Sequence, residues 1–475
     1  MSINEHLTSL SKVLTLPDGT GINKVFIDII LNEDIPIICI NRSAKKKRLM
    51  PFKVLNDNKD NFWAHSSSWE YFLSEECINT IQSKVNTKPS KWDKPEVKTN
   101  KNDEAKDADK NSFGDTYQKF AEMTNEKRVE HLDKDRKRLN ELLSQRKRDE
   151  KVLTKVLVDT TKDAALINHA VLEEAMNLAD DEAKKLTQNM VDSTNEMVRS
   201  SAQLISEDIF NNELMHSLVE KSNGTIVQHM TRVYLTGIAF LNFYNNLVST
   251  SSAIQKLRVI FPGKFRRLYH SLLPHIHIDK INLERVFYGG MRSITPELYF
   301  KWAVGFLIHD IGKGSAVEYH EGGGTYDRNI VIDHVKQGYR SIMTKTNYPM
   351  EASLITGYHH EYYGDSAGYG YFRAYLQEYR KANPNAKQDY CITYELEPIL
   401  DYQVLAYFPA KVLEIIDVYD SLTDPNRVYK KPMSAELALI TMREEFVEKH
   451  LKLDPILFYI FEMFIRESEK LGISH

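Results

Sequence analysis

The alternation of apolar and polar residues predicts a small domain at the start of the chain. Residues 25–31 and 35–40 are rich in β-branched side chains and flank an acidic turn, which indicates a pair of strands. Residues 69–81 have the apolar spacing of a helix. We therefore expect a small regulatory domain, α/β or β-rich in character, over residues 1–85.

This apolar pattern stops in the next segment. Residues 86–114 consist largely of lysine, asparagine, aspartate, proline and alanine, with few large apolar side chains. Such a segment cannot bury enough apolar surface to offset the entropy lost when a chain becomes ordered. The composition predicts a flexible linker.

A helical pattern without proline or glycine occupies residues 115–221. Apolar residues recur there every seven positions in two phases, namely Leu157, Ala164, Val171 and Leu178, and then Met190, Met197 and Leu204. This spacing predicts long helices in a bundle or a coiled coil. A homodimer through this segment and packing within one chain are both consistent with it.

From residue 222 to residue 475, helical segments with aromatic side chains alternate with glycine-rich turns, so the chain is predicted to be mainly α. The formal charge of −4 argues against bulk electrostatic binding to a nucleic-acid polymer or an anionic membrane. The cysteines Cys39, Cys77 and Cys391 are far apart and odd in number, which indicates a reducing, cytoplasmic compartment. We expect neither a signal peptide nor a transmembrane helix.

Histidines and acids are concentrated in this last part of the chain. An apolar run ends in His309-Asp310-Ile311-Gly312-Lys313, and imidazole together with carboxylate suits iron, manganese or zinc. Asp417 and Asp420 lie three residues apart and so share one face of a helix. One histidine from each of several helices, with adjacent pairs and a carboxylate, is typical of a two-metal site in a helical bundle.

The order of these residues resembles the HD-GYP family of metal-dependent phosphodiesterases. The motifs that carry the resemblance are His229, His309-Asp310-Ile311-Gly312-Lys313, His334, His359-His360-Glu361, Gly368-Tyr369-Gly370 and Asp417-Val418-Tyr419-Asp420. They span about residues 222–443. The resemblance implies an all-α catalytic domain that holds divalent ions, often iron or manganese. It also implies hydrolysis of the bacterial second messenger cyclic di-GMP to linear pGpG or to GMP.

The resemblance also assigns roles to particular residues. The family's metal ligands correspond to His229, His309, Asp310, His334, His359, His360 and Asp417, with Asp310 bridging two ions. Asp310 and Lys313 would be catalytic, and Lys313 would face the scissile phosphate. Substrate contacts would come from Gly368, Tyr369, Arg427 and Lys430. Because Thr225 stands where the family's third-metal glutamate would be, we expect two ions.

Two departures from the family pattern keep other functions open. Gly370 replaces the proline of the GYP signature, and residues 371–402 form an extra segment that we expect to act as a lid or to cover the site. These changes favour a phosphohydrolase of the same superfamily that acts on another nucleotide or cyclic dinucleotide. A third reading is a receptor that binds cyclic di-GMP with little or no turnover. The complete ligand set argues against the receptor.

Overall fold

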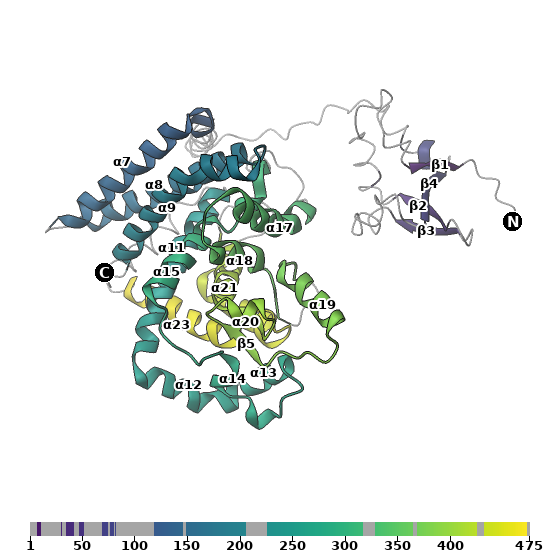
Figure 1. Cartoon of the computed structure of the whole chain (residues 1–475). Helices are drawn as coiled ribbons and strands as arrows, with labels where there is room; N and C mark the ends of the chain where they lie inside the picture. The colour runs from purple at the N-terminus through teal and green to yellow at the C-terminus, as the bar shows by residue number, and fades with distance from the viewer. Residues whose placement is uncertain are drawn as a thin grey trace, which may run out of the picture. The chain divides into compact units, whose positions relative to one another are not determined.

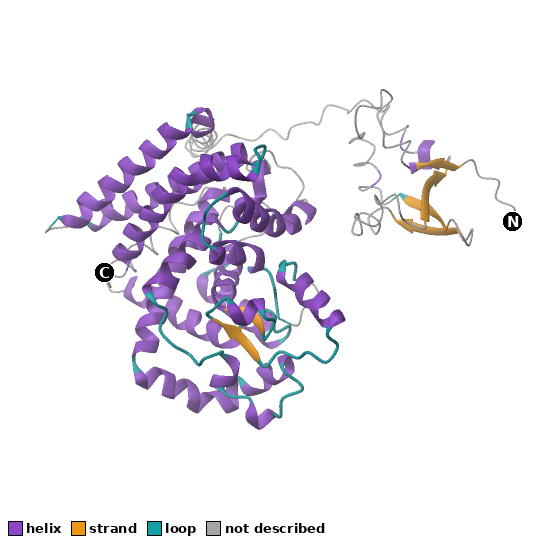
Figure 2. Cartoon of the chain, viewed as in Figure 1, coloured by secondary structure: helices purple, strands orange, loops and turns teal. Residues whose placement is uncertain are grey.

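A computed structural model gives the fold of this chain (Figures 1 and 2). It describes residues 7–10, 30, 35–41, 47–51, 69–74, 77–79, 81, 118–145, 149–205, 226–316, 328–363, 368–424 and 432–472. The chain divides into two compact units, Met1–Asn100 and Lys101–His475. The described part is mainly helical, as the sequence predicted. The expected linker over residues 86–114 lies outside the described residues.

The first unit contains a four-stranded antiparallel sheet in the order β1-β4-β2-β3. Its strands are β1 (Leu7–Ser9), β2 (Pro36–Asn41), β3 (Lys47–Pro51) and β4 (Trp69–Ser74). The prediction of a strand over residues 35–40 corresponds to β2. Of residues 25–31 only Ile30 is described, and it is helical.

The predicted helix over residues 69–81 is wrong in its first half, because residues 69–74 form β4. Three of these six residues, Trp69, Tyr71 and Phe72, are aromatic, and aromatic side chains favour strands. Strand β4 also has a hydrogen-bonded partner on both sides, β1 and β2. Pairing across the sheet therefore overrides the helical spacing, and among the described residues of this range helix is found at residues 77–79 and 81.

The second unit begins with three long helices, α7 (Asn125–Ser144), α8 (Glu150–Ala175) and α9 (Asp180–Ile205). Six apolar residues of the two seven-residue repeats are buried within this chain, namely Leu157, Ala164, Val171, Met190, Met197 and Leu204. The seventh, Leu178, is half-buried. Helices α8 and α9 pack on α11 (Ile226–Ser249), α15 (Pro296–Ile308) and α17 (Arg328–Lys345). The seams are therefore filled by contacts within one chain, and the homodimer stays a prediction.

The other named helices of this unit follow α11 along the chain. They are α12 (Ser251–Lys264), α13 (Arg266–Leu272), α14 (Leu283–Val286), α18 (Met350–Tyr358), α19 (Phe372–Ala382), α20 (Glu397–Leu400), α21 (Phe408–Thr423), α22 (Ala435–Thr441) and α23 (Pro455–Gly472), with short turns η1 (Ile278–Lys280), η2 (Ile311–Ala316) and η3 (Met442–Glu448). Among the described helices, none has the length and apolar character needed to cross a membrane.

The extra segment 371–402 contributes to the core. It contains α19, α20 and strand β5 (Tyr390–Thr393), which pairs in parallel with β6 (Val404–Tyr407). Cys391 and Tyr394 are buried, and the Tyr394 ring stacks on Phe408 with centroids 4.4 Å apart. These two strands were not predicted from the sequence. The second half of the segment therefore supports the start of α21.

A polar contact joins α7 to α8 and should depend on pH. His131 Nε2 lies 3.0 Å from Asp163 Oδ2 and 3.4 Å from Asp135 Oδ2, and the hydrogen bond to Asp163 raises the pKa of His131. A raised folded-state pKa stabilises the fold fully below the unfolded value of about 6.5, and this contribution is lost as pH rises through the folded value. Because the side chains of His131, Asp135 and Asp163 are partly exposed, this contact contributes at most about 1 kcal/mol to the free energy of unfolding.

We therefore expect His131→Gln to lower the melting temperature more at pH 6 than at pH 9. Thermal unfolding of both proteins at the two pH values checks this. Equal losses at both values would mean that the charge on His131 contributes nothing.

Candidate metal centre

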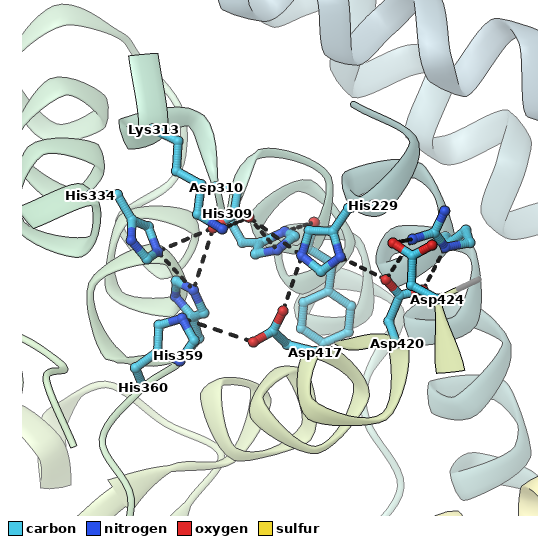
Figure 3. A network of polar contacts seen from close by, with 12 residues as sticks. His229, His309, Asp310, Lys313, His334, His359, His360, Asp417, Asp420 and Asp424 are labelled. Carbon is cyan, nitrogen blue, oxygen red and sulfur yellow. Dashed lines mark hydrogen bonds and ion pairs between the residues drawn. The ribbon is translucent and has the colours of Figure 1, made fainter. Parts of the chain in front are cut away.

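The structure brings all seven predicted ligands into one buried cluster (Figure 3). They come from five places: His229 on α11, His309 and Asp310 at the end of α15, His334 on α17, His359 and His360 at the end of α18, and Asp417 on α21. The nearest of the other predicted residues is Lys313, in the turn η2. Arg427 and Lys430 lie outside the described residues.

Helix α15 delivers His309 and Asp310 to the interior. The Thr295 side chain caps its first turn by accepting from Leu298 N, and Pro296 occupies the first helical position, where its missing N–H is not needed. The second half of the helix, residues 302–308, is buried on every face. A helix buried all round must end inside the protein, so the residues that follow it are buried as well.

Two histidine rings are oriented by the helices that they follow. His309 Nδ1 lies 2.9 Å from the carbonyl oxygen of Phe306, and His359 Nδ1 lies 2.7 Å from that of Thr356. The Nδ1–H therefore donates to a carbonyl three residues back, and Nε2 is left with a lone pair that points into the cluster. Metal-binding histidines commonly have their second ring nitrogen held in this way.

The Asp310 carboxylate lies between the imidazoles. Its Oδ1 is 3.1 Å from His334 Nε2 and 3.8 Å from His359 Nε2. Its Oδ2 is 3.4 Å from His229 Nε2 and 3.6 Å from His309 Nε2, and it accepts a hydrogen bond from Lys313. Each oxygen thus faces a different pair of histidines, which is the position of a bridging ligand.

The donors form two groups on either side of Asp310. One group is His229, His309 and Asp417, and the other is His334, His359 and His360. Within each group the donor atoms lie within 4.8 Å of one another, so one ion could reach all three. The groups meet where His360 Nε2 lies 3.9 Å from Asp417 Oδ2.

Unsatisfied polar atoms test whether this cluster fits metal ions. Among the described residues, His309 Nε2, Asp310 Oδ1 and His360 Nδ1 are buried without a hydrogen-bond partner. A buried polar atom left unpaired costs about 1–3 kcal/mol. Divalent ions bound by the cluster would satisfy His309 Nε2 and Asp310 Oδ1, and the mixture of nitrogen and oxygen donors suits iron, manganese or zinc. The residues present therefore fit a pair of ions.

The protonation states agree with this fit. Burial lowers the pKa of His309 to about 4 and that of His360 to about 3, so both rings are neutral near pH 7. Burial would raise the pKa of Asp310, but Lys313 and the surrounding histidines hold it well below its usual value. Burial alone would lower the pKa of His229, but the carboxylates of Asp310, Asp417 and Asp420 raise this pKa to about 10. An ion bound at His229 Nε2 must therefore displace a proton.

His229 is supported by Asp420, which shares a helix face with Asp417, and by Arg232, which was not predicted to belong to the site. Its Nδ1 lies 2.7 Å from Asp420 Oδ2, and Arg232 holds Asp420 with contacts of 2.6 and 2.8 Å. Arg232 Nη2 also donates to Asp424 at 3.0 Å. One signal was present in the sequence, because Arg232 lies three residues after His229 on the same face of α11.

We expect Asp420→Asn to weaken metal binding by about 10- to 100-fold, because it loosens the hydrogen bond that orients His229. Competition with a chelator of known affinity measures the change. Asp424→Asn is the matched control, because it removes the other partner of Arg232 and leaves the His229–Asp420 bond in place. Equal affinities in Asp420→Asn and the wild type would show that Asp420 does not position the ligand.

The segment Gly368-Tyr369-Gly370 is attached to the cluster through His360. The Tyr369 ring lies against the His360 ring with centroids 4.4 Å apart, and the N–H groups of Tyr369 and Gly370 both donate to the His360 carbonyl at 3.0 Å. A Cβ on Gly370 would lie 2.6 Å from Glu361 Cγ. Proline has no N–H and adds carbon atoms, so this packing explains why glycine stands here.

Comparisons of this chain with models of protein families, with curated proteins and with solved structures found no match. The geometry of the cluster and the order of its motifs therefore indicate the function.

Proposed function

We propose that this chain is a metal-dependent phosphodiesterase of the HD-GYP type that hydrolyses cyclic di-GMP to pGpG or GMP. The observation that supports the proposal most is the position of Asp310, whose two carboxylate oxygens face different pairs of histidines. A carboxylate bridge between two ions is what a two-metal phosphodiesterase requires. The order of the ligands along the chain is the second support.

Each group of donors would hold one ion, with iron or manganese as the expected metals. His229, His309 and Asp417 would hold the first, His334, His359 and His360 the second, and Asp310 would bridge them. When bound, two such ions lower the pKa of a shared water and offset the charge of a phosphate.

Lys313 is a cation that the described part of the chain offers to a substrate beside the cluster. Its side chain is 21% exposed, whereas Asp310, with which it pairs, is 1% exposed. Lys313 thus lies on the outer side of the cluster, where it would offset charge that develops on a phosphate. In the segment Gly368-Tyr369-Gly370, which is predicted to contact substrate, the Tyr369 ring lies beside the rings of His360 and His334.

The test is to purify the chain anaerobically, measure its bound metal, incubate it with cyclic di-GMP and separate the products. We expect about two ions per chain and release of pGpG or GMP. Cyclic di-GMP that binds but stays intact would support the receptor instead. Metal-free protein that cannot be loaded with iron or manganese would refute the metal centre.

One observation favours a second candidate, a phosphohydrolase that acts on another nucleotide. Gly370 is packed against Glu361, so the loop that would meet the substrate differs from the family's proline-containing loop. Incubation with a panel of cyclic dinucleotides and nucleotides, under the same conditions, distinguishes the two candidates. Faster turnover of another substrate than of cyclic di-GMP would establish the second.

A further inference from the structure

A buried ion pair lies on α21, one turn before Asp417. Lys411 and Glu414 are both 0% exposed, and Lys411 donates a hydrogen bond to the Glu414 carboxylate. Lys411 also donates to the Lys452 carbonyl at 3.1 Å and lies 4.0 Å from the centre of the Tyr363 ring. Removing two charges from water is costly, and apolar residues of similar size often give an equally stable core. Stability alone therefore does not account for this pair.

The pair holds the backbone that follows His360. Glu414 Oε1 accepts from the N–H of Tyr362 at 2.9 Å. The N–H of Tyr363 donates at 2.9 Å to the Lys452 carbonyl, the same oxygen that accepts from Lys411. The two residues after Glu361 are thus attached to Lys411 and Glu414, and so to the helix that carries Asp417.

Arg373 holds the same segment from its other side. The N–H of Arg373 donates to Glu361 Oε1 at 2.9 Å, and its Nη2 donates to the Glu361 carbonyl at 2.6 Å. Residues 361, 362 and 363 therefore each have a fixed backbone contact. This segment directly follows a predicted ligand, His360.

His360 needs this support more than the other two helix-end histidines do. His309 and His359 have Nδ1 bonded to a carbonyl of their own helix, whereas His360 Nδ1 has no hydrogen-bond partner among the described residues. The ring of His360 is therefore placed by its backbone and by Tyr369, and its Nε2 lies 3.9 Å from Asp417 Oδ2.

We infer that Glu414, whose buried charge Lys411 balances, is a positioning residue that sets His360 against Asp417 and so fixes the half of the centre made by His334, His359 and His360. This inference rests on the proposed metal centre but not on the identity of the substrate. The decisive contact is the one between Glu414 and the Tyr362 N–H.

The experiment compares two double variants that both remove the charges. Lys411→Met/Glu414→Leu removes the acceptor for the Tyr362 N–H, whereas Lys411→Met/Glu414→Gln keeps an oxygen at that position. Metal-free full-length protein is titrated with Mn²⁺, and bound Mn²⁺ is followed by electron paramagnetic resonance. We expect the leucine variant to bind one of two ions about 10- to 100-fold more weakly, and the glutamine variant to regain the wild-type affinity.

A control and a milder variant keep the result interpretable. Lys301→Met/Glu351→Leu removes another ion pair, 2.9 Å long, from α15 and α18, and should leave both affinities unchanged. Glu414→Asp keeps the charge beside Lys411 but withdraws the oxygen from Tyr362, and it should show the same weakened site if the leucine variant does not fold.

Three outcomes would overturn the inference. The first is wild-type affinity for both ions in the leucine variant, or in Glu414→Asp if the leucine variant does not fold. The second is an equal loss of affinity in the leucine and glutamine variants, which would mean that the pair supports only the fold. The third is a wild-type protein that binds no Mn²⁺, iron or zinc, which would remove the metal centre itself.

Discussion

An Asp310→Ala variant is expected to lose the two proposed metal ions and the proposed phosphodiesterase activity. The Asp310 carboxylate faces His334 and His359 with one oxygen and His229 and His309 with the other, so no other residue of the cluster can replace it. Bound metal supplies several kcal/mol of transition-state stabilisation, so the rate should fall by at least about a thousandfold.

Mass spectrometry of the metal in purified protein and product chromatography measure the two losses. Asp333→Ala is the matched control. It replaces another aspartate beside a predicted ligand, His334, but the Asp333 side chain is exposed on α17. That control should retain metal and activity. If Asp310→Ala kept about two ions per chain, the bridging role would be refuted.

A Gly312→Ala variant is expected to disrupt the centre without touching a ligand. The α-carbon of Gly312 lies so close to α17 that an added Cβ would overlap the His334 carbonyl oxygen and lie 2.5 Å from Gly338 N. These are backbone atoms, so the overlap is relieved only if η2 and α17, which carries His334, move apart. Overpacking of this kind costs about 1–3 kcal/mol and would withdraw His334 from the cluster.

The expected result is a lower melting temperature together with weaker binding of one ion. Gly263→Ala is the control, because nothing lies within 4 Å of the position of its Cβ on α12. That substitution should be neutral or slightly stabilising, since alanine is the better helix former. A Gly312→Ala protein with unchanged metal affinity would show that η2 and α17 can separate without loss of the ligand.

The sequence was a good guide wherever the information is local. The adjacent pairs His309-Asp310 and His359-His360 can be recognised from their spacing, whereas isolated ligands such as His229 came only from the family resemblance. The structure brings all seven residues together. The mainly helical character also follows from local spacing. Strand β4 was missed because its partners, β1 and β2, are far away along the chain.

The contacts that support the ligands could not be predicted for the same reason. Arg232 and Asp420 are 188 positions apart, and Glu414 is 52 positions from Tyr362. No local pattern indicates that a given arginine or glutamate will meet a particular partner at such a separation. These contacts depend on how α11, α18 and α21 pack, and only the three-dimensional structure shows them.

The two helix-end histidines have a consequence for the order in which the centre forms. The carbonyls of Phe306 and Thr356 lie in the last turns of α15 and α18, where backbone oxygens have no partner within the helix. His309 and His359 can therefore adopt their binding orientation as soon as their own helices form. His229 acquires its orientation only when Asp420, 191 residues later, has packed against it. Synthesis from the N-terminus thus leaves the centre incomplete until α21 is in place.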